Sequence, residues 1–220
     1  MLSCSIPLHR NSSKKFISVS IKSGKDNRIG QKRFQADASF IRQKSGNTSA
    51  GFVYLQEMNF LSHFYFDRHC NDAYHVLGSV MPDLLRNADK NAQVKIERLP
   101  PQNDAAINSI INGWKKHLEI DRYFHSSLFF KTHSHQLKLL FVPILAGSEV
   151  KPFFLGHIAL ELILDNLLLT NHTVFADDFY DHLKNAQTEN IAAFLELNHV
   201  DPQKFLNFYA AFIHEKYLYS

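Results

Sequence analysis

Hydrophobic residues follow two different patterns along the chain, and the change falls near residue 58. From Met58 onward they recur mostly three and four positions apart, which is the period of an α-helix. Asp104 is placed to cap a helix, and Asp201-Pro202 marks a break between two others. The spacing predicts helices over residues 59–68, 72–87, 104–127, 129–146, 150–169, 174–186, 189–198 and 202–218. We therefore expect residues 58–220 to form one all-α domain, a single bundle of about seven or eight helices.

Residues 1–57 show no helical period. They are rich in Ser, Lys, Arg, Gln and Asn, and their apolar residues occur singly or in short runs. Phe16–Ile21 alternates like one short strand and Gly51–Leu55 is a second brief apolar run, but neither has an obvious partner. We expect a disordered basic extension, either a solvated tail or a start assigned upstream of the true one. A targeting segment and a small structured appendage are the alternatives.

Charge is divided in the same way. The 220 residues carry a net charge of +3, but residues 1–57 hold ten Lys and Arg against three Asp and Glu, and the remainder is net acidic. We expect no nucleic-acid partner, because the basic residues lie outside the part predicted to fold. No uncharged apolar run reaches the roughly 18 residues of a membrane span. Cys4 and Cys70 form no disulfide framework. We expect a cytoplasmic protein, and its oligomeric state stays open.

The predicted helix over residues 104–127 carries a stripe of possible metal ligands. At 100° per residue, His117 and Asp121 fall on the same side as Trp114 and Leu128, and His125 lies near the edge of that side. A solitary charge among apolar side chains is costly. The pattern His-x3-Asp-x3-His therefore points to buried polar groups that need a partner.

A second stripe lies on the predicted helix over residues 150–169. This helix is apolar on nearly every side, which is typical of a central helix. His157, Glu161 and Asp165 follow one another at intervals of four, so they share one face. Burying two carboxylates beside a histidine requires compensation, and a divalent cation supplies it.

An ordinary explanation competes with the metal site. A single His/Asp pair four residues apart is commonly a plain ion pair, but two such stripes on apolar helices favour a metal. Ligands of the nitrogen and oxygen type without thiolate favour Mn²⁺, Fe²⁺ or Mg²⁺ over structural zinc.

Three segments, in this order, resemble one known family. Met58-Asn59-Phe60-Leu61-Ser62-His63 is similar to the amino-terminal signature of the acyl carrier protein phosphodiesterase family, Met-Asn-Phe-Leu-[Ala/Ser]-His. Leu77–Leu85 resembles the family's Gly-x-x-x-x-Asp-Leu/Phe segment, and Gly113–Asp121 resembles its Gly-x-x-x-His-x-x-Ile-Asp segment. The resemblance covers roughly residues 58–200.

The resemblance implies an HD-domain-like helical fold, Mn²⁺ as the metal, and removal of 4′-phosphopantetheine from holo-acyl carrier protein, a reaction of lipid metabolism. It carries over four metal ligands: His63, Asp83, His117 and Asp121. The spacing within the second stripe adds His157 and Asp165 as candidate ligands. The chain departs from the family in having no adjacent His-Asp dyad, and in placing His125 where close members carry a second acidic residue.

If the site is intact, we expect Glu161 or His125 to orient or deprotonate the attacking water, and Arg86 or Arg122 to be available to phosphate. Two rival functions remain: another HD-type phosphohydrolase, acting on nucleotides or a different phosphodiester, and a catalytically inactive helical binding protein. Carrier proteins are acidic, so a docking patch must be locally basic, and the candidates for it are Lys115, Lys116, Arg122 and Lys131.

Overall fold

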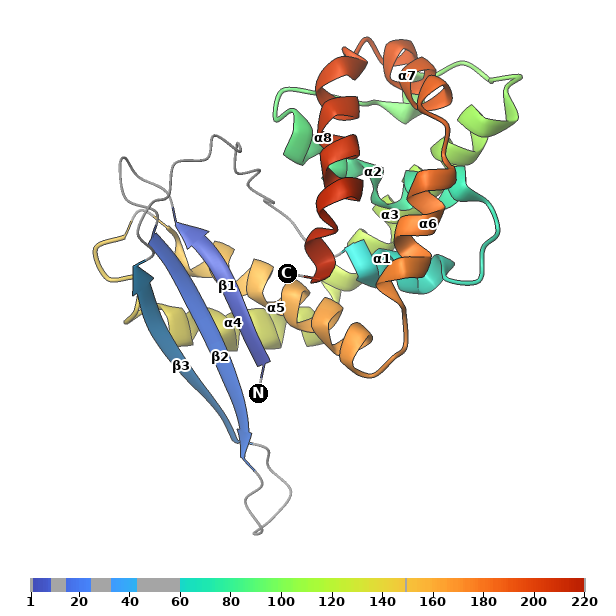
Figure 1. Ribbon diagram of the computed structural model, residues 1–220. Coiled ribbons are helices and arrows are strands. Elements are labelled where there is room, and N and C mark those ends of the chain that lie inside the picture. Colours follow the sequence, from blue (N-terminus) through green and yellow to red (C-terminus); the bar gives the residue numbers. More distant parts are fainter. Residues whose placement is uncertain (1, 9–14, 25–32, 43–59, 149, 220) are drawn as a thin grey trace. The chain divides into compact units, whose positions relative to one another are not determined.

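The computed structural model describes residues 2–8, 15–24, 33–42, 60–148 and 150–219 (Figure 1). Its three strands are β1 (Leu2–Leu8), β2 (Lys15–Gly24) and β3 (Arg33–Arg42). Its helices are α1 (Phe60–Asp67), α2 (Ala73–Ala88), α3 (Ala105–Ser126), α4 (Leu128–Phe141), α5 (Pro152–Thr170), α6 (Ala176–Asn185), α7 (Thr188–Leu197) and α8 (Pro202–Glu215). Two short 3₁₀ helices cover Ile96–Arg98 and Tyr217–Tyr219.

Contacts divide the chain into two units. The first comprises Met1–Tyr54 with Ser134–Ala159, and the second comprises Leu55–His133 with Leu160–Ser220. Helices α4 and α5 therefore each contribute residues to both units. The predicted domains, 1–57 and 58–220, divide the chain differently, because they leave residues 134–159 with the helical part.

The strands of the first unit form an antiparallel sheet in the order β1-β2-β3. The run Phe16–Ile21 lies within β2, where Ile17 pairs with Ile6 on one side and with Phe40 on the other. The predicted low order of residues 1–57 stays a prediction, and the sheet belongs with the alternative of a small structured appendage. Pairing depends on a second segment outside the strand itself, so the alternation of one strand does not reveal its partner. Gly51–Leu55 and Met58-Asn59 lie outside the described residues.

The prediction of an all-α fold after residue 58 is confirmed, and the described residues from 60 to 219 contain all eight predicted α-helices. Helices α2, α3 and α8 begin where the carboxylates of Asp72, Asp104 and Asp201 accept backbone N–H groups. Helix α4 ends at Phe141, before the predicted residue 146, because Pro143 disfavours helical conformation in the residue before it and has no N–H to donate.

The core of the second unit surrounds α2, which packs against α1, α3, α6 and α8 (Figure 1). Fully buried aromatic rings of α1, α6 and α8 meet there; they are Phe60, Phe64, Phe179, Tyr180 and Phe212. Phe60 and Phe212, for example, make an edge contact with ring centroids 5.2 Å apart. A helix of eight residues is marginal by itself, so this packing is what keeps α1 in place.

Two glycines let α2 and α3 approach closely. A Cβ atom at Gly78 would overlap the carbonyl group of Ile110, and one at Gly113 would overlap the backbone at His75 and Ser79. The backbones of the two helices are therefore in direct contact at this crossing. The contact lies next to the buried end of the candidate site.

The helical residues of the first unit have a small core of their own. It consists of Phe141, Leu145, Leu155 and Ala159. Gly156 lies against the backbone of Ser134 and Lys138, so this turn of α5 packs closely on α4.

Helix α5 is also the one helix in the described part of the chain that is long and apolar enough to cross a membrane, with a mean hydropathy of 1.6. Two carboxylates, Glu161 and Asp165, interrupt it and are both buried. Length and composition do not distinguish such a helix from the core helix of a soluble protein.

Candidate metal centre

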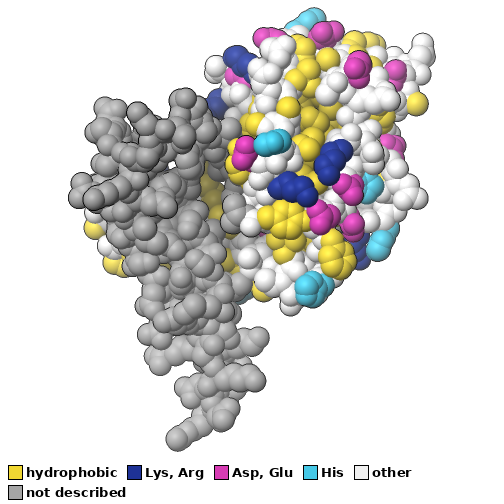
Figure 2. Space-filling view, viewed as in Figure 1, with side chains coloured by type: hydrophobic (Ala, Val, Ile, Leu, Met, Phe, Trp, Pro, Cys, Tyr) yellow, Lys and Arg dark blue, Asp and Glu magenta, His cyan; other side chains and the backbone are white. Residues whose placement is uncertain are grey.

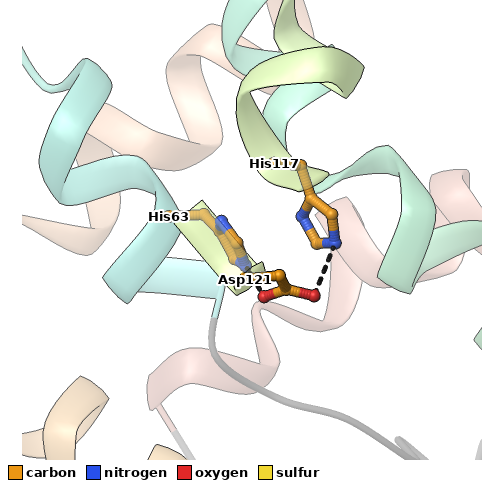
Figure 3. A group of neighbouring side chains, drawn as sticks. All are labelled: His63, His117 and Asp121. Carbon is orange, nitrogen blue, oxygen red and sulfur yellow. Dashed lines mark ion pairs between the residues drawn. The ribbon is translucent and has the colours of Figure 1, made fainter. Parts of the chain in front are cut away.

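Three predicted ligands converge in the second unit. His63 is on α1, while His117 and Asp121 lie one turn apart on α3 (Figure 3). Asp121 lies between the two imidazoles: its Oδ1 is 3.3 Å from Nε2 of His63, and its Oδ2 is 3.4 Å from Nε2 of His117. One ligand atom from each residue lies within 4.8 Å of the others. This separation allows all three to bind one cation.

The histidine rings are buried and the aspartate gives access to solvent. His63 and His117 stack with ring centroids 4.1 Å apart. Their side chains are only 1% and 3% exposed, whereas that of Asp121 is 31% exposed. The group therefore has one accessible side, as a site that must admit a substrate requires.

A backbone carbonyl fixes the tautomer of His117. Its Nδ1 lies 3.0 Å from the carbonyl oxygen of Ser79 on α2. Because a carbonyl only accepts, Nδ1 carries a proton, so that in the neutral ring the lone pair left for a cation is that of Nε2. Histidine ligands of metal ions are commonly oriented in this way. The close α2–α3 crossing at Gly113 brings Ser79 within reach.

Burial and the neighbouring charges set the protonation states. Burial lowers the pKa of His63 and outweighs the opposing effect of Asp121. Burial would also lower the pKa of His117, but Asp121 and Asp83 oppose it and the net pKa is raised. Burial alone would raise the pKa of Asp121, but the contacts with His117 and His63 hold it well below its usual range. A neutral His63 and an ionised Asp121 are the forms that bind a cation.

His63 provides the test of whether a cation fits. Neither ring nitrogen of His63 makes a hydrogen bond within the described part of the chain, although Nε2 is close to Asp121. A buried imidazole without hydrogen bonds is costly. A cation between Nε2 and the carboxylate would satisfy this nitrogen, so the residues present fit a metal.

Asp83 lies at the edge of the group. Its Oδ1 is 3.9 Å from Nε2 of His117, and the side chain is buried at the middle of α2. It contributes negative charge next to His117 but is not among the three residues whose ligand atoms cluster. Its predicted role as a ligand stays a prediction.

The two predicted catalytic residues contact each other. Nε2 of His125, at the end of α3, lies 3.2 Å from Oε1 of Glu161 on α5. Glu161 is buried, while the side chain of His125 is 32% exposed. The negative charge of Glu161 also acts on His63, where it opposes the lowering of the pKa by burial.

Asp165 is engaged elsewhere. Its Oδ2 accepts a hydrogen bond from the backbone N–H of Leu61 at 3.1 Å, and its Oδ1 accepts from the N–H and the hydroxyl of Ser62 at 2.8 and 2.6 Å. Burial raises the pKa of Asp165 to about 7, against the effect of these hydrogen bonds. The structure therefore places Asp165 at the start of α1 and not in the cluster.

The predicted stripe of α5 is divided for a geometric reason. Residues four apart on a helix are about 6 Å apart along its axis, so His157 and Asp165 are separated by about 12 Å. Glu161 contacts His125 and Asp165 contacts α1, while His157, one turn before Glu161 on α5, has a ligand atom within 4.8 Å of one of Glu161. The three residues of the stripe therefore do not bind one ion together, and the predicted role of His157 as a ligand stays a prediction.

An ion-pair cluster at the other end of α1 was not predicted. Asp67, which is buried, forms ion pairs with Lys116 of α3 and with His75 of α2, the latter at 3.4 Å. These contacts fix α1 to the helix that carries His117. Lys116 was a predicted docking residue, and its pairing with Asp67 engages it inside the unit. Asp67 lies four residues after His63, a spacing that could have suggested a second contact of the same helix.

Comparisons with known proteins add no relative. No family model, curated protein or solved structure matches this chain. The resemblance to the acyl carrier protein phosphodiesterases therefore rests on the three sequence segments alone.

Proposed function

We propose that the chain is a hydrolase that uses a divalent cation to cleave a phosphodiester. One observation carries the proposal: two buried imidazoles and one carboxylate converge within 4.8 Å and leave a single accessible side. The substrate that the sequence resemblance favours is holo-acyl carrier protein, from which 4′-phosphopantetheine would be removed.

The donor set supports the choice of metal. His63, His117 and Asp121 would hold the ion through two nitrogens and a carboxylate, a set suited to Mn²⁺ or Fe²⁺ and less to Mg²⁺, which prefers oxygen ligands alone. When bound, the cation would supply Lewis acidity toward water and toward the phosphodiester oxygens.

The remaining polar residues have distinct tasks. Ser79 holds His117 in the tautomer that presents Nε2. Glu161, paired with His125, is the group that would orient the attacking water and take its proton. The exposed edge of Asp121 is the side from which the substrate would enter.

Recognition of an acidic carrier protein would need basic residues beside this entrance. On the face drawn in Figure 2, the basic side chains of the described part are interspersed with acidic and apolar ones. Lys115, Arg122 and Lys131 are exposed, and they are the candidates for a docking patch.

The direct test incubates the full chain with holo-acyl carrier protein and Mn²⁺ and follows the mass of the carrier protein. We expect loss of the prosthetic group with the wild type and no loss with His117→Gln. Asp177→Asn is a matched control, because Asp177 is exposed and forms its ion pair with Lys216, which is not a candidate ligand.

The rival functions give different results in the same experiment. An intact carrier protein together with hydrolysis of bis-p-nitrophenyl phosphate would favour another phosphodiesterase. An intact carrier protein that binds the chain without any hydrolysis would favour an inactive binding protein. A cytoplasmic location is part of the proposal for an enzyme of this substrate.

A further inference from the structure

Helix α1 depends on groups outside itself for its position. It has eight residues, and helices this short are not stable alone. The first four N–H groups of any helix have no acceptor within the helix. In α1 the N–H groups of Leu61 and Ser62 are in this first turn. They need acceptors, since Leu61 is buried.

Asp165 supplies those acceptors from a distant part of the chain. Each carboxylate oxygen takes one backbone N–H of α1, and Oδ1 takes the Ser62 hydroxyl as well. Asp165 therefore acts as an N-terminal cap for α1 although the two are about a hundred residues apart in sequence.

The residue after this contact is His63. Its ring has no hydrogen bond of its own within the described part of the chain; it stacks on the ring of His117, and its Nε2 faces Oδ1 of Asp121 at 3.3 Å. The place of Nε2 relative to Asp121 is therefore set by where the backbone of α1 begins.

We propose that Asp165 is a positioning residue: its carboxylate fixes the start of α1 and so places His63 opposite His117 and Asp121. The proposal rests on the proposed function for its metal readout, but its effect on His63 exists without any cation. A ligand role for Asp165 has less support, because both of its oxygens already accept hydrogen bonds.

The test uses full-length chains carrying ¹⁵N-labelled histidine. Asp165→Asn keeps the shape of the side chain but turns an N–H toward a backbone N–H. Ser62→Ala removes the hydroxyl bond and leaves the two backbone bonds. Asp201→Ala removes the capping carboxylate of α8, which carries no candidate ligand, and so controls for the general loss of a cap.

Two measurements are made on each variant. The ring ¹⁵N signals of His63, assigned with His63→Gln, are recorded without cation, and the affinity for Mn²⁺ is then measured by calorimetry. We expect Asp165→Asn to move the His63 signals and to weaken Mn²⁺ binding about tenfold or more, in the range known for residues that orient ligands. Ser62→Ala should move the same signals less, and Asp201→Ala should leave them in place.

The outcomes separate this proposal from the proposed function. Unchanged His63 signals in Asp165→Asn would overturn the positioning role, whatever the stability of the variant. If Asp165→Asn does not fold, the Ser62→Ala variant serves as the test. Unmoved His63 signals in Ser62→Ala would then overturn the positioning role of Asp165. If the wild type binds no cation, the proposed function fails, while moved His63 signals in Asp165→Asn still support the positioning role.

Discussion

Three carboxyl groups in the second unit differ in pKa because their neighbours differ. Asp121 faces two imidazoles, and its pKa is held low. Asp67 meets Lys116 and His75, and its pKa is lowered as well despite burial. For Asp165 no cationic partner is among the causes of the shift: burial and the negative charge of Glu161 outweigh its uncharged hydrogen-bond donors and raise its pKa to about 7. Residue type alone does not assign these roles; the partners do.

The raised pKa of Asp165 predicts a pH dependence of stability. The unfolded chain loses this proton near the ordinary value of 3.8, and the folded chain keeps it up to a pH of about 7. Between those values the folded state binds more protons, so rising pH lowers the free energy of unfolding by up to about 1.4 kcal/mol per pH unit. Urea unfolding of the wild type and of Asp165→Asn at pH 5 and pH 7 measures this.

The difference between the two proteins isolates the contribution of Asp165, because other groups titrate alike in both. We expect the stability of the wild type relative to Asp165→Asn to decrease from pH 5 to pH 7. Equal differences at the two pH values would show that Asp165 is already ionised at pH 5.

At the scale of elements, the site depends on the crossing of α2 and α3. Gly113 lies against the backbone of His75 and Ser79, and Ser79 orients His117. The crossing thus links a packing constraint to the tautomer of a candidate ligand.

Gly113→Ala should therefore damage both stability and site. The added methyl group meets backbone atoms, which cannot move aside as a flexible side chain would, and overpacking of this kind costs about 1–3 kcal/mol. We expect a lower midpoint of thermal unfolding and a changed ring signal of His117. Asn112→Ala, at the exposed neighbouring position, is the control. A Gly113→Ala protein as stable as wild type would contradict the close crossing.

The helical period predicted the helices but not everything that they contact. Apolar spacing is a property of one segment, and so the bounds of α2 and α3 follow from it. The predicted buried stripe of α3 included His117 and Leu128. His117 is buried as predicted, but Leu128 begins α4 and is 81% exposed. The chain turns at Ser127, the last residue of the predicted helix over 104–127, and the stripe does not continue past that turn.

The site was predictable in part for the same reason. His63, His117 and Asp121 were named from sequence, and they do converge. The hydrogen bond of the Ser79 carbonyl to His117 and the capping of α1 by Asp165 were not predicted. Both involve backbone groups, which every residue carries and which a sequence pattern therefore does not distinguish. The paired strands were not foreseen either, since the short apolar runs of residues 1–57 do not show which segments pair.

At the scale of the whole molecule, the two units have separate cores. The second unit is built around α2 and the rings of α1, α6 and α8. The first unit combines residues 1–54 with 134–159. The candidate ligands His63, His117 and Asp121 all belong to the second unit.

Deletion of residues 1–57 should therefore leave the core of the second unit intact. Hydrogen exchange followed by mass spectrometry should show unchanged protection in α2, α3 and α8, with any loss confined to residues 134–159. Loss of protection in α2 or α3 would mean that the initial segment is needed by the helical core. Unchanged protection throughout would mean that residues 134–159 are stable without it.

The central claim is that His63, His117 and Asp121 bind a divalent cation, and calorimetric titration of the metal-free full chain with Mn²⁺ at physiological pH tests it most directly. We predict saturable binding to the wild type and to the Asp177→Asn control. We predict none to Asp121→Asn, whose nearly identical shape should preserve the fold, and an unchanged thermal midpoint would verify this. A wild type that binds no divalent cation, or an Asp121→Asn protein that binds Mn²⁺ as the wild type does, would contradict the account.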